Sequence, residues 1–279
     1  MPTRGSHVFV NGTIKRAEEA AISPFDVGLL RGYAVFDLLQ TIGGKPYMLT
    51  EHLTRLRASA HVLGLRVPLP DDEIASVILD LLARNGHREA TVRIVLTGGD
   101  SHDGMHFDPA TPTFYIVTHE LFDVPAEYYE KGAKLLSMEY RREFPEAKTT
   151  NYLMWLRGHA ELERQGALDL LYHCAGVVSE AATASFYAVK NGRILAPGKG
   201  VLHGTVGARV LELARAWCEV ETRDVTMEEV LGADECFLTS SVRDVVPITR
   251  IDDRVIGDGA VGPLTRTLMA LYRVDAHGE

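Results

Sequence analysis

One lysine of the chain, Lys148, stands at a position suited to covalent chemistry. The other lysines flank predicted turns or the start of a strand: Lys15, Lys45, Lys131, Lys134, Lys190 and Lys199. Lys148 comes just before a predicted apolar helix, in Glu146-Ala147-Lys148-Thr149-Thr150-Asn151-Tyr152-Leu153. An amine at such a junction can reach a cleft and form a Schiff base with an aldehyde. A solvated lysine before a helix is the more frequent case, so the position needs support from the rest of the chain.

A carboxylate in small, apolar surroundings is the second candidate. Glu180 lies in Val177-Val178-Ser179-Glu180-Ala181-Ala182. A buried carboxylate keeps a neighbouring ring nitrogen protonated, because the opposite charges stabilise each other. The alternative is a surface glutamate in a turn.

Three further segments have the chemistry to bind a phosphate. Leu202-His203-Gly204-Thr205-Val206-Gly207 precedes a predicted helix, whose first N–H groups and partial positive charge attract anions. Thr239-Ser240-Ser241 places hydroxyls at the end of a predicted strand. Arg55 adds a guanidinium, which matches phosphate geometry. Each has an ordinary alternative: a helix cap, a polar turn and a solvated helical arginine.

The elements that must position these residues form an α+β pattern. Strands are predicted near 8–15 (a hairpin at Asn11-Gly12), 33–41, 91–97, 113–118, 133–138, 168–173, 186–189, 193–195 and 235–239. Helices are predicted from a Thr50 cap to Gly64, and over 71–85, 151–164, 205–217 and 263–272. Ser23 to Gly32 is predicted as loop. Because strands and helices do not alternate regularly, we expect two α+β domains, 1–118 and 126–279, joined by a linker at 119–125.

Composition narrows the function classes. The 279 residues carry a net charge of −9 without a strongly basic segment, which disfavours a nucleic-acid surface. The three cysteines are far apart and form no CxxC pair, so neither a metal site nor a disulfide framework is indicated. The N-terminal residues lack the apolar stretch of a secretory signal, and no apolar run is long enough to span a bilayer. We therefore expect a cytoplasmic enzyme without a metal.

Taken together, these segments resemble the class IV aminotransferases, pyridoxal 5'-phosphate (PLP) enzymes of fold type IV that include the D-amino-acid and branched-chain aminotransferases. The resemblance runs from Val8 to the last helix. Its most specific stretches are His52-Leu53-Thr54-Arg55-Leu56, Lys148 to Leu153, Ser179 to Ala182, Val201 to Thr205, and Ala233 to Ser241. Each motif alone is weak, but their shared order and spacing overturn the ordinary alternatives above.

The resemblance implies a role for each matching residue. Lys148 forms the Schiff base with PLP and shuttles the proton, Glu180 pairs with the pyridine nitrogen, and Tyr152 approaches the phenolic oxygen. The phosphate is held by Arg55, Thr205, Val206, Ser240 and Ser241. This chain has Ser185 where the family usually has asparagine, which puts one hydrogen bond near the ring in doubt. The family also implies a homodimer whose sites are completed by the second subunit.

The pattern departs from both well-known subgroups. Branched-chain enzymes usually carry one more residue between the lysine and Asn-Tyr, an arginine near Gln40 and a tyrosine near Thr91; this chain lacks all three. The usual D-amino-acid enzymes carry an Arg-x-His carboxylate trap in a loop that corresponds to 99–106 here. That loop, Gly99-Asp100-Ser101-His102-Asp103-Gly104-Met105-His106, holds no arginine.

Two other arginines are candidates for binding substrate carboxylates, together with Phe36 on the strand that should line the pocket. Arg31 adjoins that strand, and Arg93 interrupts the apolar strand Thr91-Val92-Arg93-Ile94-Val95, where an unpaired charge is costly. The alternative for Arg93 is a structural arginine with a partner. Two such clamps would suit glutamate and 2-oxoglutarate. We therefore expect a transaminase of D-amino acids such as D-alanine and D-glutamate. The alternatives are an L-branched-chain aminotransferase, an aminodeoxychorismate lyase and, least favoured because Glu180 is retained, a PLP-storage protein.

Overall fold

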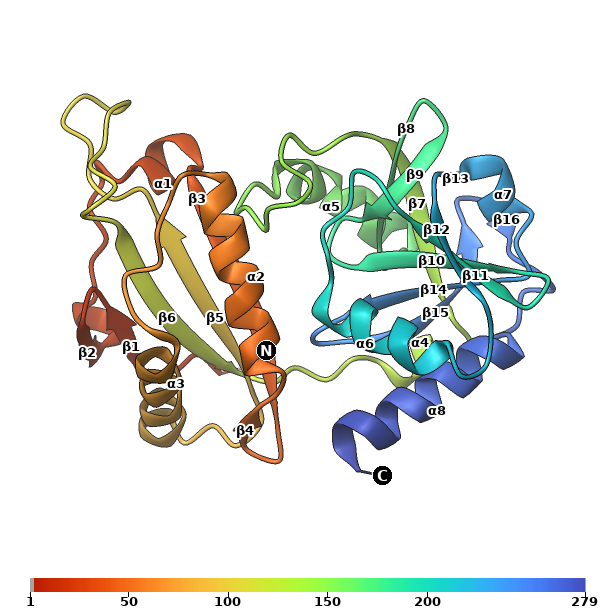
Figure 1. Ribbon diagram of the computed structural model, residues 1–279, viewed down its shortest axis with the longest axis horizontal. Helices are drawn as coiled ribbons and strands as arrows, with labels where there is room; N and C mark the ends of the chain where they lie inside the picture. The colour runs from red at the N-terminus through yellow and green to blue at the C-terminus, as the bar shows by residue number, and fades with distance from the viewer. Residues whose placement is uncertain (1–2, 279) are drawn as a thin grey trace. The chain divides into compact units, whose positions relative to one another are not determined.

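Two sheets organise the chain, one in each of two units (Figure 1). The computed structural model describes residues 3–278; Met1, Pro2 and Glu279, at the ends of the predicted domains, lie outside the described residues. The first unit extends to Asp123 and also takes in Glu146–Asn151. The second unit holds Val124–Pro145 and the described residues from Tyr152 onward. The mixture of helices and strands confirms the α+β class.

The first unit is a sheet of order β2-β1-β6-β5-β3-β4 with two long helices on one face (Figure 1). Its strands are β1 (His7–Val10), β2 (Thr13–Arg16), β3 (Ala34–Ile42), β4 (Lys45–Pro46), β5 (Ala90–Thr97) and β6 (Thr113–Glu120). Its helices are η1 (Ala17–Glu19, a 3₁₀ turn), α1 (Val27–Arg31), α2 (Leu49–Val62) and α3 (Asp71–Asn85). Buried leucines and isoleucines of α2 and α3 pack on β3 and β5 to form its core, which removes apolar surface from water.

The second unit is a larger mixed sheet of order β12-β11-β10-β14-β15-β7-β8-β9-β13, with β16 paired to β15. Its strands are β7 (Ala133–Glu139), β8 (Asp169–Cys174), β9 (Val177–Ala181), β10 (Ser185–Lys190), β11 (Arg193–Pro197), β12 (Val220–Arg223), β13 (Val225–Thr226), β14 (Glu235–Ser240), β15 (Asp244–Ile251) and β16 (Arg254–Val255). Its helices are α4 (Ala126–Glu130), α5 (Leu153–Gln165), α6 (Thr205–Ala214), α7 (Met227–Leu231) and α8 (Pro263–His277). No helix in residues 3–278 has the length and apolar character needed to cross a membrane.

Two local predictions were wrong. Part of the predicted loop 23–32 is the short helix α1, which forms because the Asp26 side chain accepts from the N–H of Gly28 and caps it. Thr50 does not cap α2: the helix begins one residue earlier, at Leu49, and the cap position belongs to Met48, which has a left-handed backbone (φ 51°) and no side-chain cap. Pattern reasoning also missed β15, whose Pro247 argues against a strand interior.

The segment 146–151 joins the first unit by strand pairing, although it follows β7 of the second unit in sequence. Thr149 pairs with Val35 on the free side of β3. The Phe36 N–H donates to the Lys148 carbonyl at 2.9 Å, and the Thr150 N–H donates to that of Ala34 at 3.1 Å. These backbone hydrogen bonds fix the backbone of Lys148. The predicted domains, with their linker at 119–125, had placed this segment in the second domain.

A buried charge network ties α2 to β3. Asp37 is fully buried, and its carboxylate accepts from both Nε and Nη2 of Arg55 at 2.8 Å. Nδ1 of His52 lies 2.7 Å from the same carboxylate. Burial raises the pKa of Asp37, but the charge and hydrogen bonds of Arg55 and His52 outweigh it and hold the pKa well below its usual 3.8. Asp37 therefore stays ionised inside the unit and fixes the Arg55 guanidinium.

We expect Asp37→Asn to destabilise the protein by about 3–5 kcal/mol at pH 7, because it leaves a buried arginine without its counter-charge. Since the folded-state pKa of Asp37 is lowered, its contribution is present above the unfolded-state pKa and is lost as pH falls below it. The stability gap between wild type and variant should therefore shrink below about pH 4. Chemical unfolding at several pH values measures this gap.

Asp80→Asn is the matched control, because Asp80 pairs with Arg84 on the surface of α3 with a side chain 45% exposed. Its effect should stay within about 0.5 kcal/mol at every pH. Equal stability of the two variants at pH 7 would contradict the role assigned to the buried network.

Candidate active site

Lys148 and Arg93 lie against the same aromatic ring in the first unit. The Lys148 Nζ is 4.7 Å from the centroid of the Phe36 ring, and the Arg93 guanidinium carbon is 4.9 Å from it. Cations at such distances are attracted by the ring's electrons. The Lys148 N–H also donates to the Ser59 hydroxyl on α2 at 3.0 Å. Three residues that the sequence singled out, Lys148, Phe36 and Arg93, are thus brought together.

Arg93 and Lys148 each place a cationic group against the Phe36 ring on this face of the sheet. In residues 3–278 no carboxylate forms an ion pair with Arg93, so the alternative of a salt-bridged structural arginine does not describe it. Burial, followed by the charges of Arg93 and Arg4, lowers the pKa of His119 on β6, which favours its neutral form. An anion that approaches this face would therefore find a guanidinium without an internal counter-charge.

The two positions at which branched-chain enzymes tend to carry arginine and tyrosine lie side by side. Gln40 on β3 pairs directly with Thr91 on β5. Arg93 pairs with Leu38, the residue two positions before Gln40, and side chains two residues apart on a strand share a face. Arg93 is thus on the same face as Gln40 and Thr91, and it supplies the positive charge that those two polar residues lack.

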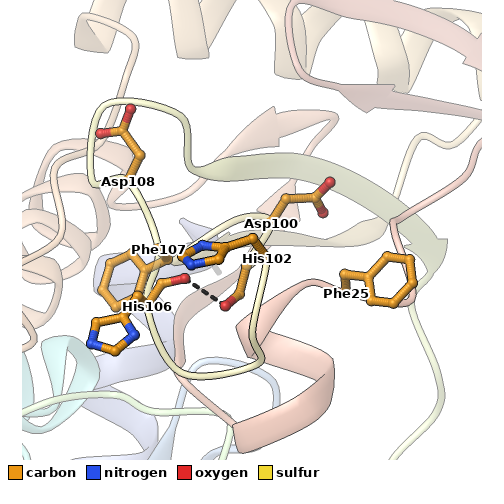
Figure 2. Close-up of a pocket in the computed structure, with 7 residues that line it drawn as sticks. Phe25, Asp100, His102, His106, Phe107 and Asp108 are labelled. Carbon is orange, nitrogen blue, oxygen red and sulfur yellow. Dashed lines mark hydrogen bonds between the residues drawn. The ribbon is translucent and has the colours of Figure 1, made fainter.

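The loop after β5 lines an open cavity of about 680 Å³ (Figure 2). The lining residues are Phe25, Asp100, Ser101, His102, His106, Phe107 and Asp108. Asp103 holds the loop together, since its carboxylate accepts from the N–H groups of Met105 and His106. The exposed Arg31, at the end of α1, contacts this loop: its Nε donates to the Met105 sulfur at 3.3 Å. Arg31 is thus held by a contact with this loop, whereas Arg93 lies over the Phe36 ring.

Glu180 is buried in the second unit, and its carboxylate accepts hydrogen bonds from two donors. Nε of Arg142 donates to its Oε1 at 2.7 Å, and the Leu202 N–H donates to its Oε2 at 3.0 Å. Burial lowers the pKa of Arg142, but the charge and hydrogen bond of Glu180, together with the neighbouring tyrosines, outweigh it and raise the pKa, so the guanidinium stays charged. Sequence reasoning weighed a buried Glu180 against a surface one, and the structure shows the buried one.

Aromatic rings hold the Arg142 guanidinium in place. It lies 5.4 Å from the ring centroids of both Tyr152 and Tyr172, and its Nη2 donates to the Ala182 carbonyl at 2.5 Å. Burial raises the pKa of Tyr172 to about 12, so its phenol stays neutral at physiological pH. Tyr152, the residue predicted near the phenolic oxygen of PLP, thus lies close to the partner of Glu180.

The start of α6 fits a phosphate. Gly204 occupies the cap position without a side-chain cap, which leaves the first turn without that kind of acceptor. A Cβ at Gly204 would collide with the Ser185 hydroxyl, and one at Gly207 would collide with the Tyr187 hydroxyl. Only glycine therefore allows this first turn, which begins with the buried Thr205 and Val206, to pack so closely on β10. Ser185, which replaces the family asparagine, lies directly against it.

The turn after β14 carries the other hydroxyl candidates, Ser240 and Ser241, both half-buried. Arg243 lies behind this turn, and its Nε donates to the Ser240 hydroxyl at 3.4 Å. The same guanidinium donates to the Thr183 hydroxyl and lies 3.6 Å from the buried Asp169 carboxylate. The turn at Ser240 is thereby tied to the turn that follows Glu180.

Sequence reasoning missed the residues that support the candidates. Arg142 and Asp37 each bind a predicted site residue that is distant in sequence, and Arg243 links Ser240 to a turn 60 positions earlier. Arg142 was not distinguishable from its neighbour Arg141, since both follow a strand and only the fold leaves one exposed and the other half-buried. Asp37 carried a usable signal: an acid within an apolar strand, followed by a helix with histidine and arginine three residues apart.

Comparison with known proteins identifies the family of the chain. The family model of amino-transferase class IV matches residues 34–251. The chain is 30% identical over 278 residues to a putative branched-chain-amino-acid aminotransferase of Methanocaldococcus jannaschii, covering 95% of each protein. It is 26% identical over 268 residues to a D-alanine aminotransferase of Listeria monocytogenes, covering 94% of this chain and 93% of the relative.

A solved structure extends the likeness to three dimensions. The chain superposes on a T.th. branched-chain amino acid aminotransferase, complexed with N-(5'-phosphopyridoxyl)-L-glutamate, with a TM-score of 0.87. The two share 26% identity, and the match covers 99% of this chain and 95% of the other. The fold is therefore that of the fold type IV enzymes, as the sequence predicted. The chain belongs to the class IV aminotransferases and is a PLP-dependent enzyme.

Proposed function

We propose that Lys148 carries the cofactor and moves the proton in an amino transfer between an amino acid and a 2-oxo acid. When bound, PLP supplies an electron-accepting ring for the electrons released at the substrate's α-carbon. The Lys148 amine would hold the cofactor through its aldehyde, and as a free amine it would move the substrate's α-proton as general base and then acid. Glu180 keeps a proton on the pyridine nitrogen, and Tyr152 donates to the phenolic oxygen.

The phosphate of the cofactor is the group we assign to the remaining candidates. The N–H groups of Thr205 and Val206 at the start of α6 supply donors and a favourable dipole. Arg55 supplies charge through Nη1, since Asp37 already occupies its Nε and Nη2. Ser240 and Ser241 supply hydroxyls. The support is the first turn of α6, which has no side-chain cap and whose two glycines let it pack closely on β10.

For the substrate, we favour D-amino acids such as D-alanine and D-glutamate, with 2-oxoglutarate as acceptor. One observation supports a substrate with two carboxylates. The Arg93 guanidinium lies beside Lys148 on the Phe36 ring, and in the described residues no carboxylate forms an ion pair with it. A substrate carboxylate would complete that charge. The relation to D-alanine aminotransferases supports the D-amino-acid preference. We propose that Arg31 binds the second carboxylate of such a substrate.

The L-branched-chain activity is the second candidate, because the 30% identical relative carries that name. Against it stand Gln40 and Thr91, polar residues at the positions where that subgroup tends to have arginine and tyrosine. An aminodeoxychorismate lyase would use the same Lys148 but release pyruvate without an amino acceptor.

We also propose a homodimer. Several large apolar side chains around Arg31 are exposed, among them Leu29 at 70% and Met105 at 65%, and a second copy of the chain would cover them. The cytoplasmic location inferred from composition stays a prediction.

Lys148→Ala should remove the visible absorbance band that the protein shows with PLP, and should abolish amino transfer. The reason is that the variant lacks the amine that binds the aldehyde. Lys199→Ala is the control, since the Lys199 side chain is 80% exposed, and it should retain both properties. A band that survives Lys148→Ala would transfer the role to another lysine.

The substrate preference is tested by single-turnover reactions of the PLP enzyme with D- and L-alanine, D- and L-glutamate, and L-leucine. We expect loss of the cofactor band with D-alanine and D-glutamate. A response to L-leucine alone would establish the branched-chain activity instead. Release of pyruvate from aminodeoxychorismate without an acceptor would establish the lyase.

Arg93→Ala should lower kcat/KM for 2-oxoglutarate by roughly tenfold to a hundredfold, the range expected for one lost charge-assisted hydrogen bond. The kcat/KM for pyruvate, which has no second carboxylate, should fall less. Arg31→Ala should show the same bias, and Arg84→Ala, on the exposed face of α3, should show none. Equal losses for both acceptors would remove Arg93 from substrate selection.

A further inference from the structure

A buried carboxylate does not stay ionised on its own. The Glu180 side chain is 6% exposed, and in such surroundings the protonated, neutral acid is favoured unless a cation compensates. Arg142 is a cation that forms an ion pair with Glu180 in the described part of the chain. The charge of Glu180 thus depends on a residue that sequence reasoning did not select.

The hydrogen bonds around Glu180 favour its ionised form as well. Arg142 Nε donates to Oε1 of Glu180, and the Leu202 N–H donates to Oε2. A carboxylate can accept from both and still has lone pairs, since it offers about four acceptor positions. A neutral acid would accept less strongly from both, and neither neighbour offers an acceptor for its proton. Both neighbours therefore hold Glu180 as an acceptor.

Arg142 itself cannot easily move away. Its guanidinium lies close to the rings of both Tyr152 and Tyr172, and its side chain is 15% exposed. Its Nη2 bonds the Ala182 carbonyl, in the turn that directly follows Glu180 on β9. One side chain thus fixes both the charge of Glu180 and the turn behind it.

We propose that Arg142 is a positioning residue that keeps Glu180 ionised and aimed, and thereby sets how strongly the protein holds a protonated pyridine ring. This inference rests on the role proposed for Glu180. Arg142 acts through the carboxylate, since its Nε donates to Glu180 and its Nη2 to the Ala182 carbonyl behind it.

The test is a double-mutant cycle read by PLP affinity, with apoenzyme titrated by PLP and binding followed by quenching of tryptophan fluorescence. Arg142→Met keeps the length and apolar contacts of the side chain but removes its charge. We expect Arg142→Met and Glu180→Gln each to weaken PLP binding by roughly tenfold to a hundredfold, as for one lost charge-assisted hydrogen bond. Because Arg142 acts through Glu180, the double variant should be no weaker than Glu180→Gln alone, within about threefold.

Two further measurements separate this role from a general structural one. Inhibition of PLP binding by inorganic phosphate should be unchanged in Arg142→Met, because the phosphate residues on α6 are intact. Arg142→Lys should bind PLP more tightly than Arg142→Met, because lysine retains the positive charge. It should bind PLP less tightly than the wild type, because it lacks the planar guanidinium that bonds both Glu180 and Ala182.

The outcomes are distinct. If Glu180→Gln leaves PLP affinity unchanged, the proposed role of Glu180 fails, and this inference with it. If Glu180→Gln weakens binding but Arg142→Met does not, only the inference fails. Losses that multiply in the double variant, or a loss of phosphate inhibition in Arg142→Met, would show that Arg142 supports the fold and not the charge of Glu180.

Discussion

The short strand pairing between Thr149 and Val35 is the interaction on which the position of Lys148 depends. Two backbone hydrogen bonds hold the lysine segment along the free side of β3, and they place the Lys148 amine over the Phe36 ring. A lysine in a loop without this pairing would have many positions open to it. Because adjacent residues of a strand face opposite sides, β3 serves both faces at once. Phe36 lies under the amine, and Asp37 holds Arg55 on the helix side.

In each unit a buried acid next to the proposed site is paired with an arginine. Asp37 has Arg55, and Glu180 has Arg142. Charges removed from water are costly unless the partner geometry is good and the remaining hydrogen-bonding positions are filled. In both pairs these conditions hold: the carboxylate accepts from several donors, and the arginine is fixed by further contacts. The result in each case is a charged group with one orientation, which is what recognition of a phosphate or a ring nitrogen requires.

Arg93 is the exception to this pattern. It is partly buried and interacts with an aromatic ring, and in the described residues no acid completes its charge. A folded protein tolerates such a group where a ligand supplies the counter-charge during function. The contrast between Arg93 and the paired arginines Arg55 and Arg142 is the physical reason why we propose substrate binding for the first and support of the cofactor for the other two.

The amino-acid sequence determined the α+β class, the family and the residue types of the proposed cofactor site, because these depend on local periodicity and on several motifs kept in one order. It marked Lys148, Glu180 and the Gly204-Thr205 turn as candidates by the chemistry of their neighbours, and the shared order and spacing of the motifs favoured them over the ordinary alternatives. Only the tertiary structure decided which side chains support them.

Asp37 and Arg142 meet their partners across 18 and 38 positions of sequence, and Arg243 reaches Thr183 across 60. Their burial depends on strands packed from elsewhere in the chain. The same holds for the start of α2 and for β15, where long-range pairing and packing outweighed local preference. Burial and pairing are properties of the folded chain, so no local pattern specifies them.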